Sequence, residues 1–321
     1  MNLDTKNFIT EKLNIDFKLT PLTGDAGTRQ YFKIKNDMKN KYILCAYKKD
    51  ELTSFDYFLN VNTLFTNQKI KTPEILHTSK HLGLMILEDL GDVTLEDAFK
   101  DSYDLTLYKQ ALNELIKIQS IPPQEGSIAH SYAFTVKKFD WEFNFSLEHL
   151  TNLYSLDLTS IDIDTLKQEF TSISSYLFNL PQVVTHRDFH SRNLINKTDG
   201  IYVIDFQDAR MGNPFYDLTS LIEDTYTGLS AEQKEILTAY YKEQSSLEFD
   251  EEFSKSYSIQ ALQRSIKACG SFAWLKNVIG TDRYIQYIKP SLINIKRFLN
   301  DLNTYPELTK FVNLCAKEEG L

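Results

Sequence analysis

Residues 183–208 read VVTHRDFHSRNLINKTDGIYVIDFQD and alternate short apolar runs with polar residues. Asp188 and Asn193 stand five apart in the pattern HRDxxxxN, and Asp205 follows Asp188 by seventeen residues at the end of an apolar run. The segment KTDG at 197–200 is a turn sequence, and the β-branched run after it predicts a strand. We therefore expect a hairpin that holds Asp188 and Asp205 at strand ends beside a loop.

Two carboxylates and an amide in this order are typical of phosphoryl transfer. Asp188 would take the proton of an attacking hydroxyl, while Asn193 and Asp205 would hold the magnesium ion that carries nucleotide phosphates. Taken singly, Asp188 could instead cap a turn, and Asp205 could end a strand in a solvated loop. The joint pattern at this separation favours the catalytic interpretation, with ATP and Mg²⁺ as cofactors.

A second polar segment, near the N-terminus, has the composition of a phosphate-binding turn. Residues 23–30 read TGDAGTRQ and lie between two candidate strands, at 17–22 and 31–34. A tight turn between strands can lay its backbone N–H groups over phosphates, although most such turns are only hairpins. We assign nucleotide contacts to a set of residues in this turn, namely Gly24, Asp25, Ala26, Gly27, Thr28 and Arg29.

Five segments carry a resemblance to a known family. They are DAGTRQYF (25–32), LEDLG (87–91), HRDFHSRN (186–193), IDFQDA (204–209) and YDLTSL (216–221). Over its whole length the chain resembles the aminoglycoside phosphotransferase and choline kinase family, which shares the protein-kinase-like fold. Within that family it is most similar to the bacterial anomeric sugar kinases, which phosphorylate N-acetylmuramate and N-acetylglucosamine at C1 in cell-wall recycling.

The resemblance implies an α+β, two-lobed fold. Residues 1–91 would form a small, β-rich N-lobe with the nucleotide-binding sheet and the hinge. Residues 92–321 would form a larger, helical C-lobe with the catalytic loop and the acceptor site. In the hinge, backbone groups of Glu88 and Leu90 would meet adenine.

The same resemblance implies a role for individual residues of the catalytic segment. Asp188 matches the catalytic base, and Asn193 and Asp205 match the magnesium ligands. His186 matches a residue that braces the catalytic loop. Asp217 resembles a buried acid that anchors this loop through backbone N–H groups.

One departure from the kinase pattern concerns the third strand, where a lysine normally holds the α- and β-phosphates. Residues 42–49 read YILCAYKK, with no lysine inside the apolar run. Lys48 is the nearest candidate, but its place near the strand end favours a solvated side chain. The sugar kinases that the chain resembles also tend to lack this lysine. We hypothesise that Arg29, or another cation near the Gly-bearing turn, neutralises phosphate charge instead.

Acceptor contacts are assigned to residues near the catalytic segment and on later helices. Asp208 follows Asp205 by three positions, and it would either bind sugar hydroxyls or cap a turn. His190 lies in the catalytic loop, where it would line the pocket or brace the loop.

Two further pairs of charged residues are acceptor candidates. Glu223 and Asp224 follow YDLTSL, and they would either point into the pocket or lie on a solvated helix face. Arg264 and Lys267 stand three apart on one face of a predicted helix. These cations would meet a phosphate or the lactyl carboxylate of N-acetylmuramate, unless they are only solvated.

The remaining secondary structure is read from hydrophobic periodicity and capping signals. We expect strands at 17–22, 30–35, 41–47 and 82–87, an extended segment from 72, a helix starting at 94, and helices at 52–68, 108–119, 230–244, 254–279 and 283–303.

The composition is ordinary for a globular protein, at 42% hydrophobic and 25% charged residues. The net charge of −9 argues against a nucleic-acid partner, which would favour a basic surface. The three cysteines are too few and scattered for a disulfide framework or a zinc cluster. Neither an export leader nor a run of about eighteen apolar residues is visible. We expect a cytoplasmic monomer without membrane partners, acting on a small-molecule sugar and ATP.

Two rival functions stay open at this point. The same chemistry could act on another acceptor, such as an aminoglycoside, choline, homoserine or a different sugar; choline would favour an aromatic cage. A nucleotide-binding pseudokinase is the second rival, supported only by the missing strand lysine.

Overall fold

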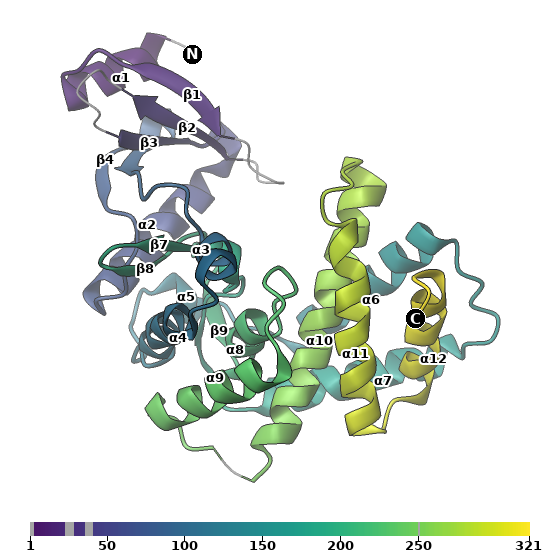
Figure 1. The fold of residues 1–321 in the computed structure, drawn as a ribbon. Helices are drawn as coiled ribbons and strands as arrows, with labels where there is room; N and C mark the ends of the chain where they lie inside the picture. The colour runs from purple at the N-terminus through teal and green to yellow at the C-terminus, as the bar shows by residue number, and fades with distance from the viewer. Residues whose placement is uncertain (1–2, 23–28, 36–40, 250) are drawn as a thin grey trace.

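An antiparallel sheet forms most of the N-terminal part of the chain (Figure 1). The structure is a computed structural model that describes residues 3–22, 29–35, 41–249 and 251–321, without the side chain of Lys41. In these residues the sheet has the order β1-β2-β3-β5-β4. Its strands are β1 (Lys18–Leu22), β2 (Gln30–Lys35), β3 (Lys41–Ala46), β4 (Ile75–Ser79) and β5 (Leu84–Glu88).

The two faces of this sheet pack against different helices. Helix α1 (Leu3–Leu13) buries Phe8 and Ile9 on one face, in a cluster with alternate residues of β2, β3 and β5. Helix α2 (Leu52–Asn67) packs on the other face, where Cys45 and Met85 join the largest core cluster. Because side chains alternate along a strand, Tyr31, opposite Cys45 in the β2–β3 register, lies on this second face as well.

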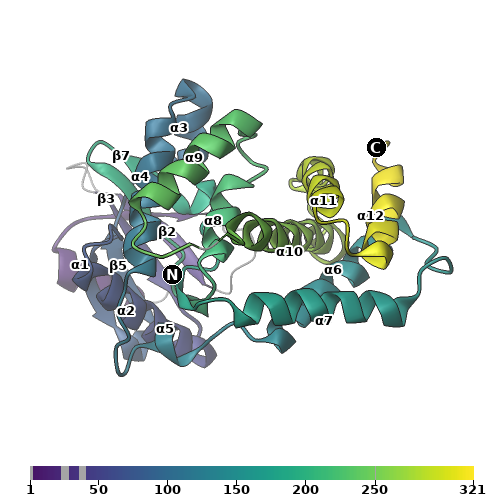
Figure 2. The ribbon, with the colours of Figure 1, turned by 90° about the horizontal axis from the view of Figure 1, so that it is seen from below.

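The rest of the chain is mainly helical, so the molecule has the predicted α+β class with a small β-rich part and a larger helical part. Helix α10 packs against both α6 and α11 in a second core cluster (Figure 2). The helices are α3 (Leu95–Ser102), α4 (Leu105–Gln119), α5 (Ile128–Ser131), α6 (Val136–Tyr154), α7 (Ile163–Asn179), α8 (Phe215–Ile222), α9 (Ala231–Gln244), α10 (Phe253–Trp274), α11 (Ile288–Leu302) and α12 (Pro306–Glu318).

Residues 183–208 run through short strands in the helical part of the molecule. Strands β7 (Leu194–Lys197) and β8 (Gly200–Val203) form the predicted hairpin. Strand β6 (Val183–Thr185) pairs instead with β9 (Arg210–Gly212). Asp188 therefore lies after β6 and Asp205 after β8, each at a strand end as expected.

Helix boundaries follow capping and proline. Thr94 and Asp97 form a capping box at the start of α3, and Ser230 and Gln233 form another at α9, both as predicted. The helix predicted at 283–303 begins later, at Ile288. The reason is Pro290, which has no N–H and is tolerated in the first turn of a helix but not in its interior.

The helix predicted at 254–279 has the expected span but changes its geometry near the end. Its α-helical part ends at Trp274 and continues as the π-helical turn Leu275–Ile279, which stops at Gly280 with φ +80°. Among the described helices, none is both long enough and apolar enough to span a bilayer.

Candidate active site

The loop after β6 is fixed by its own histidine. The backbone N–H of Asp188 donates to Nδ1 of His186 at 3.2 Å, so the proton of this imidazole is on Nε2, which donates to the carbonyl of Ile204 at 2.9 Å. Burial lowers the pKa of His186, which keeps the ring neutral in this tautomer. His186 thereby joins the Asp188 loop to the end of β8, as expected of a bracing residue.

A buried carboxylate in the first turn of α8 anchors the same loop. Asp217 accepts the backbone N–H groups of His186 at 2.6 Å and of Arg187 at 2.9 Å. Arg187 has φ +84°, so the loop adopts a conformation that needs external support. Burial raises the pKa of Asp217 to about 7 although both N–H bonds favour its ionised form.

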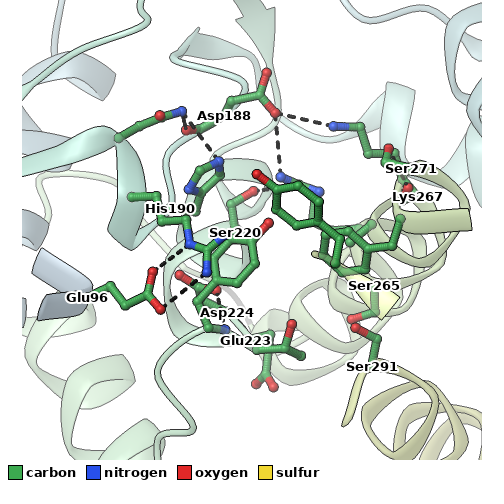
Figure 3. Close-up of a pocket in the computed structure, with 18 of the residues that line it drawn as sticks. Glu96, Asp188, His190, Ser220, Glu223, Asp224, Ser265, Lys267, Ser271 and Ser291 are labelled. Carbon is green, nitrogen blue, oxygen red and sulfur yellow. Dashed lines mark hydrogen bonds and ion pairs between the residues drawn. The ribbon is translucent and has the colours of Figure 1, made fainter. Parts of the chain in front are cut away.

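Asp188 faces two cations of helix α10 (Figure 3). Its Oδ1 atom lies 3.2 Å from Nζ of Lys267 and 3.6 Å from Nη2 of Arg264. Burial opposes ionisation, but the positive charges of Lys267, Arg187 and Arg264 outweigh it and hold the pKa of Asp188 well below its usual range. The carboxylate is therefore ionised at neutral pH.

Asn193 and Asp205 offer oxygen atoms suited to a hard divalent cation. The Nδ2 atom of Asn193 donates to the carbonyl of Asp188 at 2.9 Å, which fixes the amide orientation and turns Oδ1 away from that carbonyl. Asp205, with φ +62°, receives Arg29 at 3.1 Å and Gln207 at 2.9 Å on Oδ1. Among the described residues, hydrogen bonds reach neither Oδ1 of Asn193 nor Oδ2 of Asp205.

These two side chains fit Mg²⁺ as partial ligands. Mg²⁺ is commonly held by one or two carboxylates together with phosphate oxygens and waters, rather than by a full protein cage. In the described part of the chain, groups of three or more His, Cys, Asp or Glu placed for a metal do not occur. The two side chains could therefore supply part of a coordination shell, with the remaining ligands coming from a bound molecule and water.

The residues of the N-terminal part that were predicted to bind the nucleotide differ in what the structure shows of them. Gly24, Asp25, Ala26, Gly27 and Thr28 lie outside the described residues. The side chain of Glu88 forms an ion pair with Lys197 at 2.6 Å, so this residue can meet a nucleotide only through its backbone. Leu90 lies two residues after the end of β5.

Positions 42–46 of the third strand carry no lysine. Cys45 is buried on the face of β3 that packs toward α2, and Lys48 is exposed, as the sequence indicated. Arg29 lies just before β2 instead, with its side chain only 15% exposed, and its Nη1 atom is buried without a hydrogen-bond partner among the described residues. Burial opposes its charge, but Tyr31 and Asp205 raise the pKa of Arg29, so it stays cationic.

A cavity of about 680 Å³ lies between the catalytic loop, α8 and α10 (Figure 3). Asp188, His190 and Asn193 line it from the loop, Asp205 from the end of β8, and Arg264 and Lys267 from α10. The structure thus brings these predicted base, metal and acceptor residues to one cavity.

The tautomer of His190 follows from its neighbour. The Nδ2 atom of Asn193 donates toward Nε2 of His190 at 3.4 Å, so the proton of His190 lies on Nδ1. Burial lowers the pKa of His190 to about 3, which keeps the ring neutral. Its Nδ1 atom is buried without a partner among the described residues, and the ring lines the cavity.

Sequence comparisons place the whole arrangement in a family. The profile of the phosphotransferase enzyme family matches residues 18–253. The chain belongs to the phosphotransferase enzyme family. It is 30% identical to the N-acetylmuramate/N-acetylglucosamine kinase of Neisseria meningitidis serogroup B, over 95% of this chain and 92% of that protein. It is 26% identical to the kinase of the same name from Pseudomonas putida, over 93% of this chain and 88% of that protein.

Two solved structures of other phosphotransferases share the fold. ADP-bound aminoglycoside phosphotransferase APH(2'')-Ib superposes with a TM-score of 0.62 at 17% identity, over 92% of this chain and 97% of that one. The choline kinase LicA of Streptococcus pneumoniae gives 0.61 at 16% identity, over 94% and 100%. These matches confirm the predicted kinase-like fold.

Three acidic residues of this phosphotransferase have other partners than the suggested sugar. Asp208 is not among the residues that line the cavity, and its carboxylate pairs with Arg187 at 3.2 Å. Glu223 and Asp224 do line it, but their oxygens already accept hydrogen bonds. Glu223 receives Lys234, Arg297 and Tyr257, and Asp224 receives the backbone N–H and hydroxyl of Ser191 and the N–H of Tyr226.

The sequence reasoning also passed over a residue inside its own key motif. Arg192 lines the cavity, and its Nε atom lies 2.5 Å from Oε2 of Glu96 in α3. Its guanidinium lies 3.7 Å from the ring centre of Tyr226. Position in HRDFHSRN was the available signal, but the partners of Arg192 come from α3 and from the segment after α8, far away in sequence.

Proposed function

We propose that this phosphotransferase transfers the γ-phosphoryl group of ATP to the anomeric hydroxyl of N-acetylmuramate or N-acetylglucosamine, with Mg²⁺. The observation that carries the proposal is the convergence of Asp188, Asn193 and Asp205 on one cavity. The two relatives described above, matched over nearly the whole chain, are named for kinases of these sugars. We place this activity in cell-wall sugar recycling by a cytoplasmic monomer.

The chemistry at the acceptor rests on Asp188. Its carboxylate, ionised because of Lys267 and Arg264, accepts the proton of the anomeric hydroxyl as the oxygen attacks phosphorus. An anomeric hydroxyl is more acidic than an ordinary alcohol, so a weakly basic carboxylate is adequate. The bracing by His186 and Asp217 keeps the base in position, which supports an in-line attack.

Nucleotide binding is assigned to both parts of the molecule, residues 1–91 and residues 92–321. Asn193 and Asp205 would hold Mg²⁺, which when bound offsets charge on the phosphate oxygens. The turn from Gly24 to Thr28 would cover the phosphates, and backbone groups of Glu88 and Leu90 would meet adenine. The ADP-bound relative with the same fold makes nucleotide use by this cleft plausible.

Arg29 is proposed to replace the missing strand lysine. A buried cation whose Nη1 atom has no hydrogen-bond partner among the described residues, next to a proposed metal ligand, fits an anionic phosphate. We expect Arg29→Met to weaken ATP binding about tenfold, in titration calorimetry with and without Mg²⁺. Lys48→Met, at an exposed position two residues after β3, is the control and should bind ATP like the wild type. Unchanged ATP affinity in Arg29→Met would remove this role.

His190, Arg264 and Lys267 are proposed to face the acceptor and the transferring group. The Nδ1–H group of His190, which has no partner among the described residues, would donate to a sugar oxygen. The two α10 cations stand beside the base, where charge develops on the phosphoryl oxygens in the transition state. Asp208, Glu223 and Asp224 are left out because their carboxylates already pair within the protein.

Cationic acceptors are the less favoured alternative. A choline site would need an aromatic cage around the ligand's positive charge. Here Tyr226, Tyr284 and Tyr287 surround the guanidinium of Arg192, at 3.7, 5.6 and 5.1 Å, so the chain's own cation fills that place. The pseudokinase alternative is disfavoured by the full set of base and metal-binding side chains in one cavity.

The test is an ADP-release assay with ATP and Mg²⁺ against N-acetylmuramate, N-acetylglucosamine, glucose, choline, homoserine and kanamycin. We expect turnover with the N-acetylated sugars and an acid-labile phosphate in the product, as for a phosphate at C1. Turnover confined to choline, homoserine or kanamycin would refute the proposed acceptor but keep the phosphotransferase chemistry. Silence with every acceptor, together with ATP binding, would favour a pseudokinase.

A further inference from the structure

Arg192 is held from three sides at the wall of the acceptor cavity. Its Nε and Nη2 atoms contact the two carboxylate oxygens of Glu96, at 2.5 and 3.3 Å, and Nη2 also donates to the hydroxyl of Tyr287 at 2.8 Å. The ring of Tyr226 lies flat against the guanidinium, at 3.7 Å. An arginine held by a forked ion pair and a ring contact has little rotational freedom, so its remaining N–H groups have a fixed direction.

One nitrogen of Arg192, Nη1, takes part in none of these hydrogen bonds. Nη1 is buried and has no hydrogen-bond partner among the described residues, although Arg192 lines the cavity. Buried donors in native proteins are nearly always satisfied, so such a group points to a ligand atom. Glu96, which is shared with Lys100, offsets part of the positive charge, so the Nη1 donor suits a neutral oxygen, such as an amide carbonyl, as well as an anion.

The neighbouring cavity wall is apolar. Tyr226, Phe272 and Tyr284 line the cavity beside Arg192, and the rings of Phe272 and Tyr284 stack at 5.8 Å. Tyr226 packs on Phe272 at 6.0 Å, which joins the three rings into one surface. A donor beside an aromatic surface is complementary to a group that pairs a carbonyl oxygen with a methyl group.

We infer that Arg192 and these rings form a subsite for the acetamido group of the acceptor. Nη1 donates to the carbonyl oxygen, and the methyl group packs on the rings. The base Asp188 and Arg192 lie four residues apart in one loop. In the sugar, the reacting hydroxyl at C1 and the acetamido group at C2 are on adjacent carbons, so both groups would face this loop. This inference rests on the proposed function and adds the feature that separates N-acetylated sugars from other hexoses.

The experiment compares kcat/KM for N-acetylglucosamine and for glucose, which differ in the acetamido group. We expect the wild type to prefer N-acetylglucosamine. In Arg192→Lys the ratio of the two values should fall about tenfold, because an ammonium can pair with Glu96 but lacks the second arm of the fork. Any effect of the substitution on the rest of the site enters both values and cancels in their ratio. Lys100→Gln is the matched control, since Lys100 also pairs with Glu96, at 2.6 Å, but does not line the cavity.

Tyr287→Phe provides a second route if Arg192→Lys does not fold. It removes only the hydroxyl that accepts from Nη2, so the ratio should fall two- to threefold through looser positioning of Arg192. An unchanged ratio in the folded variants, or a wild type without preference, would overturn the subsite alone. Loss with N-acetylmuramate but not with N-acetylglucosamine would assign Arg192 to the lactyl carboxylate instead. A wild type inactive on every sugar would overturn the proposed function and this subsite together.

Discussion

The two sides of the catalytic loop hold an aspartate in opposite ways. On the α10 side, Asp188 meets the side-chain cations Lys267 and Arg264. On the α8 side, Asp217 is completely buried and meets two backbone N–H groups. The pKa of Asp188 is held well below its usual range, whereas that of Asp217 is raised to about 7. The full positive charges beside Asp188 outweigh the cost of burying an ionised carboxylate. The amide dipoles beside Asp217 do not.

The difference gives the two residues opposite pH signatures. A depressed folded-state pKa means that Asp188 contributes stability above its unfolded-state pKa, and this contribution is lost as the pH falls through the folded value. A raised pKa means that Asp217 favours the folded state below its unfolded-state value. That contribution is lost as the pH rises toward about 7.

Removal of the charged aspartate should have the largest effect. Asp188→Asn keeps the shape of the side chain but cannot accept the proton, so kcat should fall about 10³-fold. ATP affinity by calorimetry should change little, because the proposed nucleotide contacts lie elsewhere. Turnover near the wild-type rate would contradict the assignment of Asp188 as base.

Substitution of Asp217, whose carboxylate accepts two backbone N–H groups, should mainly lower the stability of the fold. In Asp217→Asn the amide nitrogen faces one of the two N–H donors, which should lower the free energy of unfolding by about 1–3 kcal/mol. Because native Asp217 loses stability between the usual carboxyl pKa and about 7, the gap between wild type and variant should be larger at pH 5 than at pH 7.5. Urea denaturation at both pH values measures this, and a gap that widens with pH would contradict it.

The next smaller effect concerns the cation that keeps Asp188 charged. In Lys267→Met the pKa of Asp188 should rise, so the acidic limb of the kcat/KM profile should move to higher pH. Lys255→Met, an exposed position near the start of α10, is the control. An acidic limb in the same place for Lys267→Met and the wild type would show that Lys267 does not set this pKa.

Asp208 should give the smallest effect. Its carboxylate is about half exposed, and its pairs with Arg187 and Arg210 lie away from the cavity lining. Exposed ion pairs contribute little, so Asp208→Asn should lower the free energy of unfolding by less than about 1 kcal/mol. KM for the sugar should stay at the wild-type value; an increase of tenfold or more would restore Asp208 as an acceptor residue.

Local patterns predicted much of the scaffold. The hairpin β7–β8, the α2 helix and the capping boxes of α3 and α9 depend on turn, cap and periodicity signals within a few residues of each other. The late start of α11 was readable too, since Pro290 belongs in a first helical turn. Helix α1 gave little signal, because only Phe8 and Ile9 of its residues are buried.

Non-local pairing explains what the sequence left open in the site. Glu223 looked like a residue of a solvated face or a pocket, yet it receives Arg297 from α11 and Lys234 from α9. Arg192 was within the decisive motif, but its contact with Glu96 spans almost one hundred residues of sequence. Such partners come together only when separate helices pack.

By itself, the sequence determined which side chains could act as base and metal ligands, because their spacing in one loop and hairpin is a local property. The tertiary structure decided whether these side chains are ionised and which groups surround them. Lys267 and Arg264 reach Asp188 only because α10 packs beside the catalytic loop. Charge interactions depend on distance in space rather than on separation along the chain, and burial makes them strong.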